Sequence, residues 1–459
     1  MDRTTEMLSS FACSLHYDEL NPETVHQVKR VLVDTLACAM GGYLSEPAKI
    51  ATQLARTVTS TLPSRILGTK DHSSPDMAGF ANSVMVRYLD YNDIGVGGHP
   101  SDSIPGALAM ADYLGSDGRS VIASVVVNYE VGRRVLDHVQ HALGWDHGIL
   151  RALGAACAAG KIMGLDQEQM GHAISLAVVP NLALGQTRVG ELSMWKGCAG
   201  PIGTRAGIFA AQLAQQGMTG PFEPFDGSEG LWAKILDNSV RLEGSWGEPY
   251  TINDTRLKFF PSQGGTQGPT GLAVELHTQL STTAEIELIR IFLPGQLLLR
   301  AVSEPEKWHP KTRETADHSI PYLVAVALQD GAVTPASFDT QRIQDPELHS
   351  LITRMNAEED PEYSRLYPDQ INCRIEVTTA SGKQLAAHSA YPKGHPRNPM
   401  TDAEIDAKFR SLSAELLTAQ QCDRALNLLW SLEDQPNLGE LFDALVVQAE
   451  ATQENEIRR

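Results

Sequence analysis

Hydrophobic side chains recur at helical spacing over most of the first half of the chain. The clearest case begins at Asn21-Pro22, where Asn21 is suited to cap a helix, Pro22 suits its first position, and apolar residues follow every three or four positions until Gly41-Gly42. Similar stretches, rich in alanine and glycine, predict helices over 104–115, 120–137, 149–163, 167–178 and 200–216. Small residues let helices pack closely, so we expect a mainly helical unit.

The pattern changes after about residue 265. Residues 285–293 are β-rich, and Cys373, Ile375 and Val377 alternate with charged residues before Ser381-Gly382, which is typical of a hairpin. Helical patterns return over 316–330 and 345–356, and again from about residue 402. The fold class predicted is mainly α with a second α+β domain.

The order of these patterns predicts how the domains divide the chain. A large helical domain would comprise residues 1–265 and 396–459 and so be discontinuous in sequence, and a smaller α+β domain would comprise residues 266–395. This arrangement requires the chain to leave the first domain, build the second and return. We therefore expect helices near the N-terminus to pack against those of the C-terminal tail.

Composition narrows the class of protein and of partner. Of the 459 residues, 42% are hydrophobic, enough for a sizeable core, and 56 acidic residues against 37 basic ones give a net charge of −19. Such a charge opposes attraction to nucleic acid or to an anionic membrane. No apolar run approaches the roughly 20 residues that span a bilayer, and the first residues lack a secretory pattern. We predict a cytoplasmic protein without nucleic-acid or membrane partners.

The six cysteines are widely scattered, with no C-x-x-C pair and no cysteine and histidine cluster of zinc spacing. Buried apolar thiols are the favoured interpretation, and three cysteines converging on an iron–sulfur cluster are the less favoured alternative. We therefore predict no metal and no cofactor.

The densest polar segment spans residues 88–103 and surrounds a glycine-rich loop. Its carboxylates Asp90 and Asp93 and the imidazole of His99 are groups that transfer protons when their environments separate their pKa values. The alternative is a surface loop with a helix cap at Ser101 or Ser103.

Three later segments carry further candidates. His147 precedes an alanine-rich helix, where the positive helix end attracts carboxylate ligands, although a capping role is the commoner one. Lys196 follows an apolar stretch and would place a cation in a cavity, the alternative being a solvated lysine. The segments 258–263 and 317–322 would serve either a site or packing. Motifs of nucleotide hydrolases, nicotinamide enzymes and zinc proteases are missing from the sequence.

Taken in order, these segments resemble the MmgE/PrpD family over nearly the whole chain. The pieces that carry the resemblance are Val33-Asp34-Thr35-Leu36, Leu89-Asp90-Tyr91-Asn92-Asp93, Gly98-His99-Pro100-Ser101-Asp102, Asp146-His147, Trp195-Lys196-Gly197, Lys258-Phe259-Phe260-Pro261, Asp317-His318-Ser319 with Tyr322, and Gly394-His395-Pro396-Arg397-Asn398-Pro399. The resemblance implies a homodimer with a metal-independent site in the cleft between a helical domain and an α+β lid.

By the same resemblance, the catalytic positions are Asp90, Asp93, His99, His147, Lys196 and Tyr322. We expect substrate contacts from Asn92, Ser101, Gln263 and His318. The implied substrate is a small di- or tricarboxylate. The form of the segment from Leu89 to Asp102 is similar to the dehydratase branch, which favours dehydration of 2-methylcitrate or a related 2-alkylcitrate.

One segment departs from the family pattern. Many dehydratases have an acidic, an aromatic and a histidine residue after Lys258-Phe259-Phe260-Pro261, whereas this chain reads Ser262-Gln263-Gly264-Gly265. A shortened, glycine-lined wall would admit a longer alkyl chain than methyl. Decarboxylation of a cis-aconitate-type substrate, epimerisation, and a catalytically disabled anion-binding protein therefore stay open as alternatives.

Overall fold

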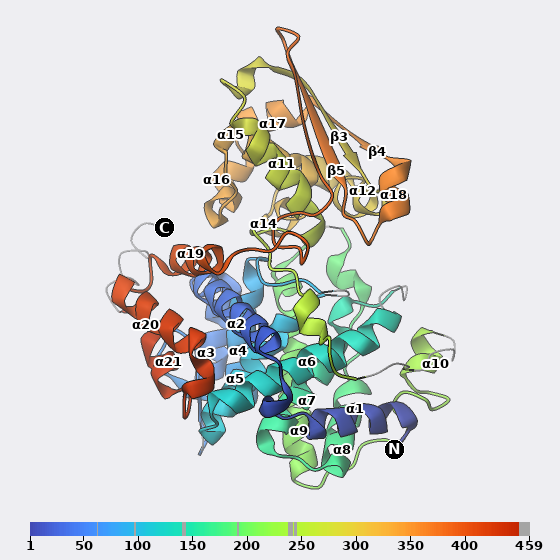
Figure 1. Cartoon of the computed structure of the whole chain (residues 1–459), viewed down its shortest axis with the longest axis vertical. Coiled ribbons are helices and arrows are strands. Elements are labelled where there is room, and N and C mark those ends of the chain that lie inside the picture. The colour runs from blue at the N-terminus through green and yellow to red at the C-terminus, as the bar shows by residue number, and fades with distance from the viewer. Residues whose placement is uncertain are drawn as a thin grey trace.

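The computed structural model describes residues 1–61, 63–95, 98–139, 144–190, 192–236, 242 and 246–448, without the side chains of residues 136, 137, 147 and 149. The chain forms a larger helical domain, in the lower part of Figure 1, and a smaller domain that contains a sheet, in the upper part. This arrangement confirms the fold class predicted from the sequence.

The larger domain is built from helices in the first half of the chain. They are α1 (Arg3–Ser14), α2 (Pro22–Gly42), α3 (Glu46–Arg56), α4 (Pro75–Tyr88), α5 (Ile104–Leu114), α6 (Gly118–Val139), α7 (Arg151–Met163), α8 (Gln167–Val178), α9 (Ala199–Gln215) and α10 (Leu231–Ile235). A short hairpin of β1 (Ser64–Arg65) and β2 (His72–Ser73) lies between α3 and α4. The helices predicted over this region are confirmed to within a few residues.

Helix α2 begins and ends where the sequence predicts. Asn21 caps it, because its Oδ1 accepts from the backbone N–H of Thr24 at 2.7 Å. The helix ends at Gly42, the second glycine of the Gly41-Gly42 pair. A Cβ on Gly42 would lie 2.0 Å from the carbonyl oxygen of Met85, so this glycine lets α2 approach α4 closely.

The smaller domain holds a four-stranded sheet in the order β4-β3-β5-β6. Its strands are β3 (Ile286–Leu293), β4 (Met355–Glu359), β5 (Cys373–Thr379) and β6 (Gln384–Ser389), of which β3 and β4 pair in parallel and the others antiparallel. Its helices are α11 (Gln267–His277), α12 (Gly295–Ala301), α13 (Pro305–Trp308), α14 (Arg313–Ala316), α15 (Ile320–Asp330), α16 (Thr340–Ile343), α17 (Pro346–Ile352) and α18 (Pro361–Leu366).

The predicted hairpin is confirmed, and alternate residues of β5 are buried as the sequence pattern requires. The helix expected over 345–356 is wrong at its end. It stops at Ile352, and Met355 begins β4, where it pairs with Ile289 of β3. Pairing with a distant strand decides the conformation of this short apolar segment, whose own periodicity is ambiguous.

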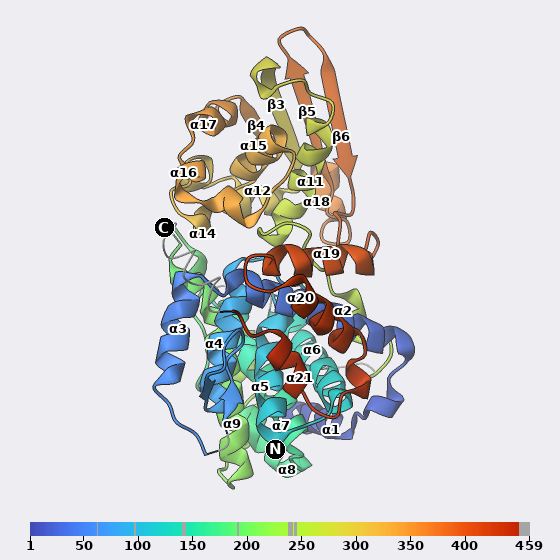
Figure 2. The same ribbon diagram turned by 90° about the vertical axis from the view of Figure 1, so that its left-hand side faces the viewer.

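The C-terminal helices α19 (Asp402–Ser413), α20 (Ala419–Trp430) and α21 (Gly439–Ala444) return to the larger domain, and Figure 2 shows them against its surface. Phe409 and Leu429 are buried in the same core as Leu36 of α2. The predicted packing of N-terminal and C-terminal helices is therefore confirmed.

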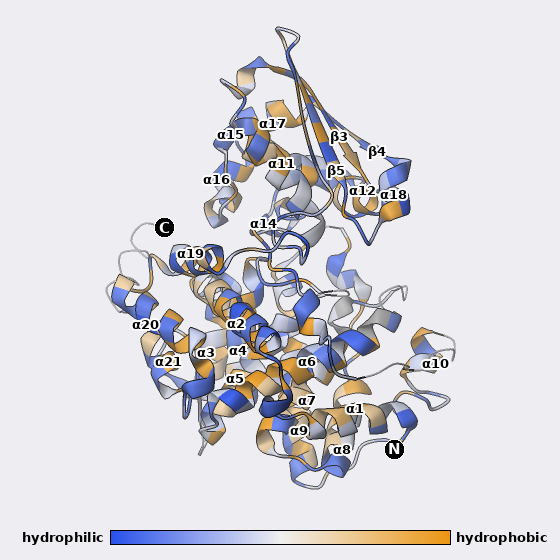
Figure 3. Ribbon diagram, viewed as in Figure 1, coloured by the Kyte–Doolittle hydropathy of each residue, from blue (hydrophilic) through white to orange (hydrophobic). Residues whose placement is uncertain are grey.

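The hydrophobic core falls into two large clusters. One holds buried residues between Leu8 and Leu257 and again between Met400 and Leu445, and the other holds those between Phe260 and Ala387. Figure 3 shows hydrophobic stretches along helices of the larger domain, such as α5, and on strands of the smaller one. Domain boundaries at residues 265 and 396 stay a proposal, which this division of the core supports. Across the described ranges, no helix combines the length and the apolar character needed to cross a membrane.

Candidate active site at the domain junction

Asp90 lies at the centre of a buried ionic cluster just after α4. Its backbone φ of 48° is left-handed, which turns the chain sharply as the helix ends. One carboxylate oxygen lies 2.7 Å from Arg87 Nη1 and 2.5 Å from Lys258 Nζ, and the other lies 3.3 Å from Lys196 Nζ. Burial by itself would raise the pKa of Asp90, but these cations outweigh it and hold that pKa well below its usual range. Asp90 is therefore ionised near neutral pH and holds Arg87, Lys196 and Lys258 in position.

Lys196 joins the two domains through this cluster. It belongs to a short 3-10 helix of the larger domain (Met194–Gly197), and its Nζ lies 2.8 and 2.9 Å from the two carboxylate oxygens of Asp317 in the smaller domain. The side chain is 3% exposed. The alternative of a solvated surface lysine is therefore wrong.

His318 follows Asp317 between α14 and α15 and is held through its Nδ1. This atom lies 2.5 Å from Asp317 Oδ1 and 3.1 Å from Lys196 Nζ. Burial, followed by the charge of Lys196, lowers the pKa of His318 to about 4, so the ring is neutral near pH 7. The other ring nitrogen, Nε2, lies 3.7 Å from Asp90 Oδ2.

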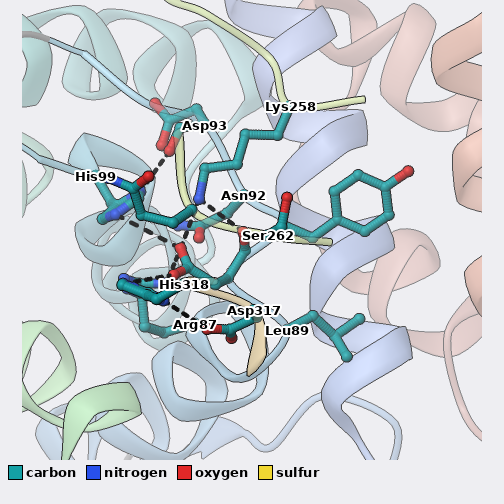
Figure 4. Close-up of polar contacts among 12 residues, drawn as sticks. Arg87, Leu89, Asn92, Asp93, His99, Lys258, Ser262, Asp317 and His318 are labelled. Atoms are coloured by element: carbon teal, nitrogen blue, oxygen red, sulfur yellow. Dashed lines mark hydrogen bonds and ion pairs between the residues drawn. The ribbon is translucent and has the colours of Figure 1, made fainter. Parts of the chain in front are cut away.

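His99 is oriented in a similar way from the glycine-rich loop. Its Nδ1 lies 2.6 Å from the backbone carbonyl oxygen of Asp93, which can only accept, so Nδ1 is the donor. In the neutral ring, Nε2 then holds the lone pair, and it lies 3.8 Å from Asp90 Oδ1. Figure 4 shows His99, Lys258, Asp317 and His318 converging from separate segments. Two imidazole nitrogens thus face Asp90 across gaps longer than a hydrogen bond.

Asp93, Asn92 and Ser101 belong to a buried hydrogen-bonded group that is separate from the ionic cluster. Tyr129 donates to Asp93 Oδ2 at 2.7 Å, and Ser101 Oγ donates to Asp93 Oδ1. Asn92 Nδ2 donates to Ser101 Oγ at 2.7 Å and to Asp102 Oδ1 at 2.9 Å. Burial outweighs the hydrogen bonds to Asp93 and raises its pKa to about 6.

The loop interpretation offered as an alternative for this segment is wrong. Ser101 and Ser103 are buried, and neither caps a helix through its side chain, because Ser101 binds Asp93 and Ser103 donates to the carbonyl oxygen of Arg151. These contacts place Ser101 and Ser103 in the interior of the protein.

A second buried ion pair anchors the loop and the segment that carries Lys258. Lys408 of α19 lies 2.6 Å from Asp34 Oδ1 of α2, and its Nζ also donates to the backbone carbonyl oxygens of Tyr91 at 2.8 Å and Lys258 at 3.0 Å. The returning C-terminal helix therefore helps to position Asp90 and Lys258.

Gln263 and its neighbouring glycines lie at the edge of a pocket between the domains. The backbone N–H of Gln263 donates to the carbonyl oxygen of Asp317 at 2.9 Å, and its Oε1 accepts from Gly265 at 2.7 Å. A Cβ on Gly264 would lie 2.3 Å from Ile94 Cδ1, and one on Gly265 would lie 2.7 Å from Leu297 Cδ2. Both glycines line the pocket, so room for an alkyl chain longer than methyl stays a prediction.

Of the two remaining predicted catalytic residues, Tyr322 is not brought to this cluster, and the side chain of the other is not among those described. Tyr322 is fully buried in the core of the smaller domain, where its hydroxyl donates to the carbonyl oxygen of Ser337 and its ring lies beside Phe338. The side chain of His147 lies outside the described residues. Its backbone begins a 3-10 helix (His147–Leu150), which Asp146 caps by accepting from Gly148 at 2.7 Å.

Sequence reasoning missed three members of the cluster: Arg87, Lys258 and Asp317. Arg87 lies in the last turn of α4, and Asp90 follows three residues later, just past the end of that helix. Lys258 and Asp317 belong to segments that stood out in the sequence without a role for these two residues. Their long-range partners carry no local signal.

Asp90, Asp317 and His318 offer oxygen and nitrogen atoms that all lie within 4.8 Å of one another, the spacing of a metal site. Lys196 Nζ, however, contacts Asp90, Asp317 and His318 Nδ1, the last at 3.1 Å. The ammonium group therefore supplies the positive charge that a metal ion would bring, and a cation placed there would be repelled by it.

Comparison with known proteins identifies the family of this chain. Its residues 6–242 match the MmgE/PrpD N-terminal domain and its residues 260–434 match the MmgE/PrpD C-terminal domain. The chain is 25% identical over 452 residues to cis-aconitate decarboxylase from Homo sapiens, which covers 93% of this chain and 91% of the relative. It is 29% identical over 403 residues to 2-methylcitrate dehydratase from Cupriavidus necator, with 80% and 81% covered. The protein belongs to the MmgE/PrpD family.

Proposed function

We propose that the protein is a hydro-lyase that dehydrates 2-methylcitrate or a related 2-alkylcitrate to the corresponding cis-aconitate without a metal or an organic cofactor. The observation that carries the proposal is the orientation of His99, whose Nδ1–H is held by the carbonyl oxygen of Asp93 while Nε2 faces the cluster of Asp90, Lys196 and Lys258. A base beside fixed cations suits removal of a proton next to a carboxylate.

The elimination breaks one C–H and one C–O bond, forms a C=C bond and releases water. His99 Nε2 takes the proton from the carbon next to a substrate carboxylate, and Lys196 and Arg87 stabilise the negative charge that develops on that carboxylate. Burial lowers the pKa of Lys258 to about 8, so its ammonium group is a better proton donor than an ordinary lysine. We assign Lys258 the role of delivering a proton to the departing hydroxyl.

The sequence prediction placed Asp90 and Asp93 in proton transfer, and the geometry favours other roles for both. Asp90 is a stable anion that fixes the cations, and Asp93 holds His99 through its backbone carbonyl. We therefore assign both as positioning residues. Ser101 donates to Asp93 and Asn92 donates to Ser101, so both help to position Asp93 in this proposal. His318 lies close enough to the cluster to contact the substrate.

The test is incubation of the purified protein with citrate, 2-methylcitrate, longer 2-alkylcitrates and cis-aconitate. Product mass and ultraviolet absorbance then distinguish loss of water from loss of carbon dioxide. We expect loss of 18 Da from an alkylcitrate, the mass of water. A panel that yields no product would contradict the enzymatic proposal, and ligand-dependent thermal stabilisation without turnover would favour the disabled anion-binding protein.

Decarboxylation of a cis-aconitate-type substrate is the second candidate. It is supported by the match to cis-aconitate decarboxylase over 93% of this chain. Epimerisation would use the same proton removal followed by its return to the carbon. The panel separates these reactions, since only decarboxylation releases carbon dioxide and epimerisation leaves the mass unchanged.

We also propose a cytoplasmic homodimer, for which exposed apolar side chains offer support. Ile202 and Phe209 of α9 lie two helical turns apart on one face and are 36% and 54% exposed, and Met194 and Trp195 just before α9 are 43% and 50% exposed. A second copy of the chain covering this face would bury them. Analytical ultracentrifugation should give the mass of a dimer for the wild type. Phe209→Asp should shift the measured mass toward that of the monomer.

A further inference from the structure

Among its described lining residues, the pocket between the two domains has several basic side chains and no acidic one. It occupies about 550 Å³ including the part open to solvent, which is in the range of small-molecule sites. Arg256, Lys258, Arg300, Lys393 and His395 contribute to its wall, whereas no aspartate or glutamate stands among the described residues that line it. In a chain of net charge −19, such a concentration of cations runs against the overall charge and favours an anionic ligand.

Two of these cations have no hydrogen-bond or ion-pair partner among the described residues. Neither the Arg256 nor the Arg300 guanidinium group forms a hydrogen bond or an ion pair with any residue in the described part of the chain. Lys393 differs, because its Nζ lies 2.9 Å from Glu404 Oε2, outside the pocket wall. Guanidinium groups bind carboxylates in a bidentate manner, so two unpaired ones facing a pocket are suited to an anionic ligand.

The position of Arg256 ties the pocket to the ionic cluster. Its backbone pairs with Ile94 through hydrogen bonds of 2.8 and 3.0 Å, which places it beside the loop of Asp93 and His99. Lys258 lies two residues later, lines the same pocket and contacts Asp90 at 2.5 Å. A ligand that extends from the cluster past Lys258 would therefore reach Arg256.

His395 adds a neutral donor to the same wall. Its Nδ1 accepts from the backbone N–H of Arg397 at 3.1 Å, so the neutral ring carries its hydrogen on Nε2. Burial, followed by the charges of Arg256 and Arg397, lowers the pKa of His395 to about 4. The ring is thus a hydrogen-bond donor in an electropositive setting.

We propose that Arg256 and Arg300 bind the carboxylate of the substrate arm that does not react, and so set the preference of the enzyme for tricarboxylates over dicarboxylates. The inference rests on the proposed function for the identity of the reacting end. The apolar residues Leu297 and Ile371 of the smaller domain line the same pocket and would pack against the carbon chain between the carboxylates.

The first experiment measures binding and needs no turnover. Its probes are propane-1,2,3-tricarboxylate, which lacks the hydroxyl that would leave, and propane-1,2-dicarboxylate, which also lacks one carboxylate arm. Calorimetry on the wild type should show tighter binding of the tricarboxylate. Arg256→Gln and Arg300→Gln should each weaken its binding about tenfold or more, the effect of a lost charge-assisted hydrogen bond, and leave dicarboxylate binding unchanged.

The matched control is Arg424→Gln, since Arg424 is an exposed arginine that pairs with Glu440 away from the pocket. This variant should bind both probes as the wild type does. Equal weakening of both probes in the pocket variants, or no weakening of either, would overturn the proposal. If a glutamine variant fails to fold, Arg256→Lys and Arg300→Lys take its place and should bind the tricarboxylate with intermediate affinity.

Two further measurements distinguish a pocket for the substrate arm from a separate anion site and from a pocket in an inactive protein. Inorganic phosphate should compete with the tricarboxylate, whereas simultaneous binding of both would show a separate anion site and overturn the assignment to the substrate arm. Turnover of the substrate panel is then measured on the same variants. Tricarboxylate selectivity in binding without any turnover would contradict the proposed function and leave the pocket assignment standing.

Discussion

The ionic cluster and the pocket both concentrate cations at the domain junction. They differ in whether carboxylates of the protein pair with these cations. In the cluster, Asp90 and Asp317 lie within ion-pair distance of Lys196, and Asp90 also pairs with Arg87 and Lys258. In the pocket, Arg256 and Arg300 have no such partners among the described residues. Paired charges inside the protein hold each other in fixed positions. Cations left unpaired in a pocket are available to bind an anionic ligand.

The largest expected effect on stability comes from removing the charge of Asp90 from the ionic cluster. Asp90→Asn keeps the shape and tolerates the left-handed backbone, yet leaves Lys196, Lys258 and Arg87 without their shared anion. We expect a loss of about 3–5 kcal/mol in the free energy of unfolding, measured by urea denaturation. Turnover should fall with it, since the cations lose their fixed positions.

The two controls for Asp90→Asn sharpen the comparison. Asp71→Asn removes an exposed partner of Arg56 and should cost about 0–1 kcal/mol. Arg256→Gln removes no ion pair and should change the free energy of unfolding by about 0.5 kcal/mol or less. An Arg256→Gln variant as unstable as Asp90→Asn would show that the pocket cations are structural.

The second largest effect is a loss of turnover without a loss of stability, which we expect on replacing His99. His99→Asn places an amide nitrogen near the position of Nδ1, where it can still donate to the carbonyl oxygen of Asp93, but it removes the lone pair of Nε2. We expect the rate to fall by about 10²–10⁴ at nearly unchanged stability, and steady-state kinetics checks this. His388→Asn, at an exposed position on β6, is the control. A His99→Asn enzyme with the wild-type rate would remove His99 from proton transfer.

A smaller effect concerns the buried carboxyl of Asp93 and its dependence on pH. Its pKa rises from 3.8 to about 6 on folding, so between these values the folded state binds more protons than the unfolded state. The contribution of Asp93 to stability is therefore most favourable at low pH and is lost as the pH rises through 6. Asp93→Asn should gain about 1–3 kcal/mol relative to the wild type between about pH 4 and pH 7.

Urea unfolding of both proteins at the two pH values measures this difference. His318 contributes in the opposite direction, because its pKa falls to about 4 on folding and its contribution is lost as the pH falls from 6.5. The comparison of Asp93→Asn with the wild type cancels that contribution. A difference between the two proteins that does not change with pH would contradict the raised pKa of Asp93.

The smallest expected effect is that of removing metals. Among the described residues, Asp90, Asp317 and His318 are the group that could bind an ion, and Lys196 contacts all three. Exhaustive treatment with a chelator should therefore leave turnover unchanged. Elemental analysis of the untreated enzyme provides the second measurement. Stoichiometric iron whose removal abolishes activity would favour the iron–sulfur alternative instead.

Local patterns let the sequence determine the elements and the family. Helical spacing from Asn21 onward, and alternation from Cys373 to Val377, are properties of short segments and predicted α2 and the hairpin directly. The segment from Leu89 to Asp102 likewise carried its resemblance in a continuous run. The sequence also indicated that chemistry is concentrated near Asp90 and His99.

Only the tertiary structure decided how those residues are charged and paired. Asp90 and Asp93 are three positions apart and both buried, yet one has a lowered pKa and the other a raised one. The difference comes from Arg87, three positions before Asp90, and from Lys258 and Lys196, which reach Asp90 from more than 100 residues away in the chain. Among the described residues, Asp93 instead accepts hydrogen bonds from hydroxyl and amide donors. A pKa depends on burial and on charges brought close by folding, and neither is a property of the local sequence.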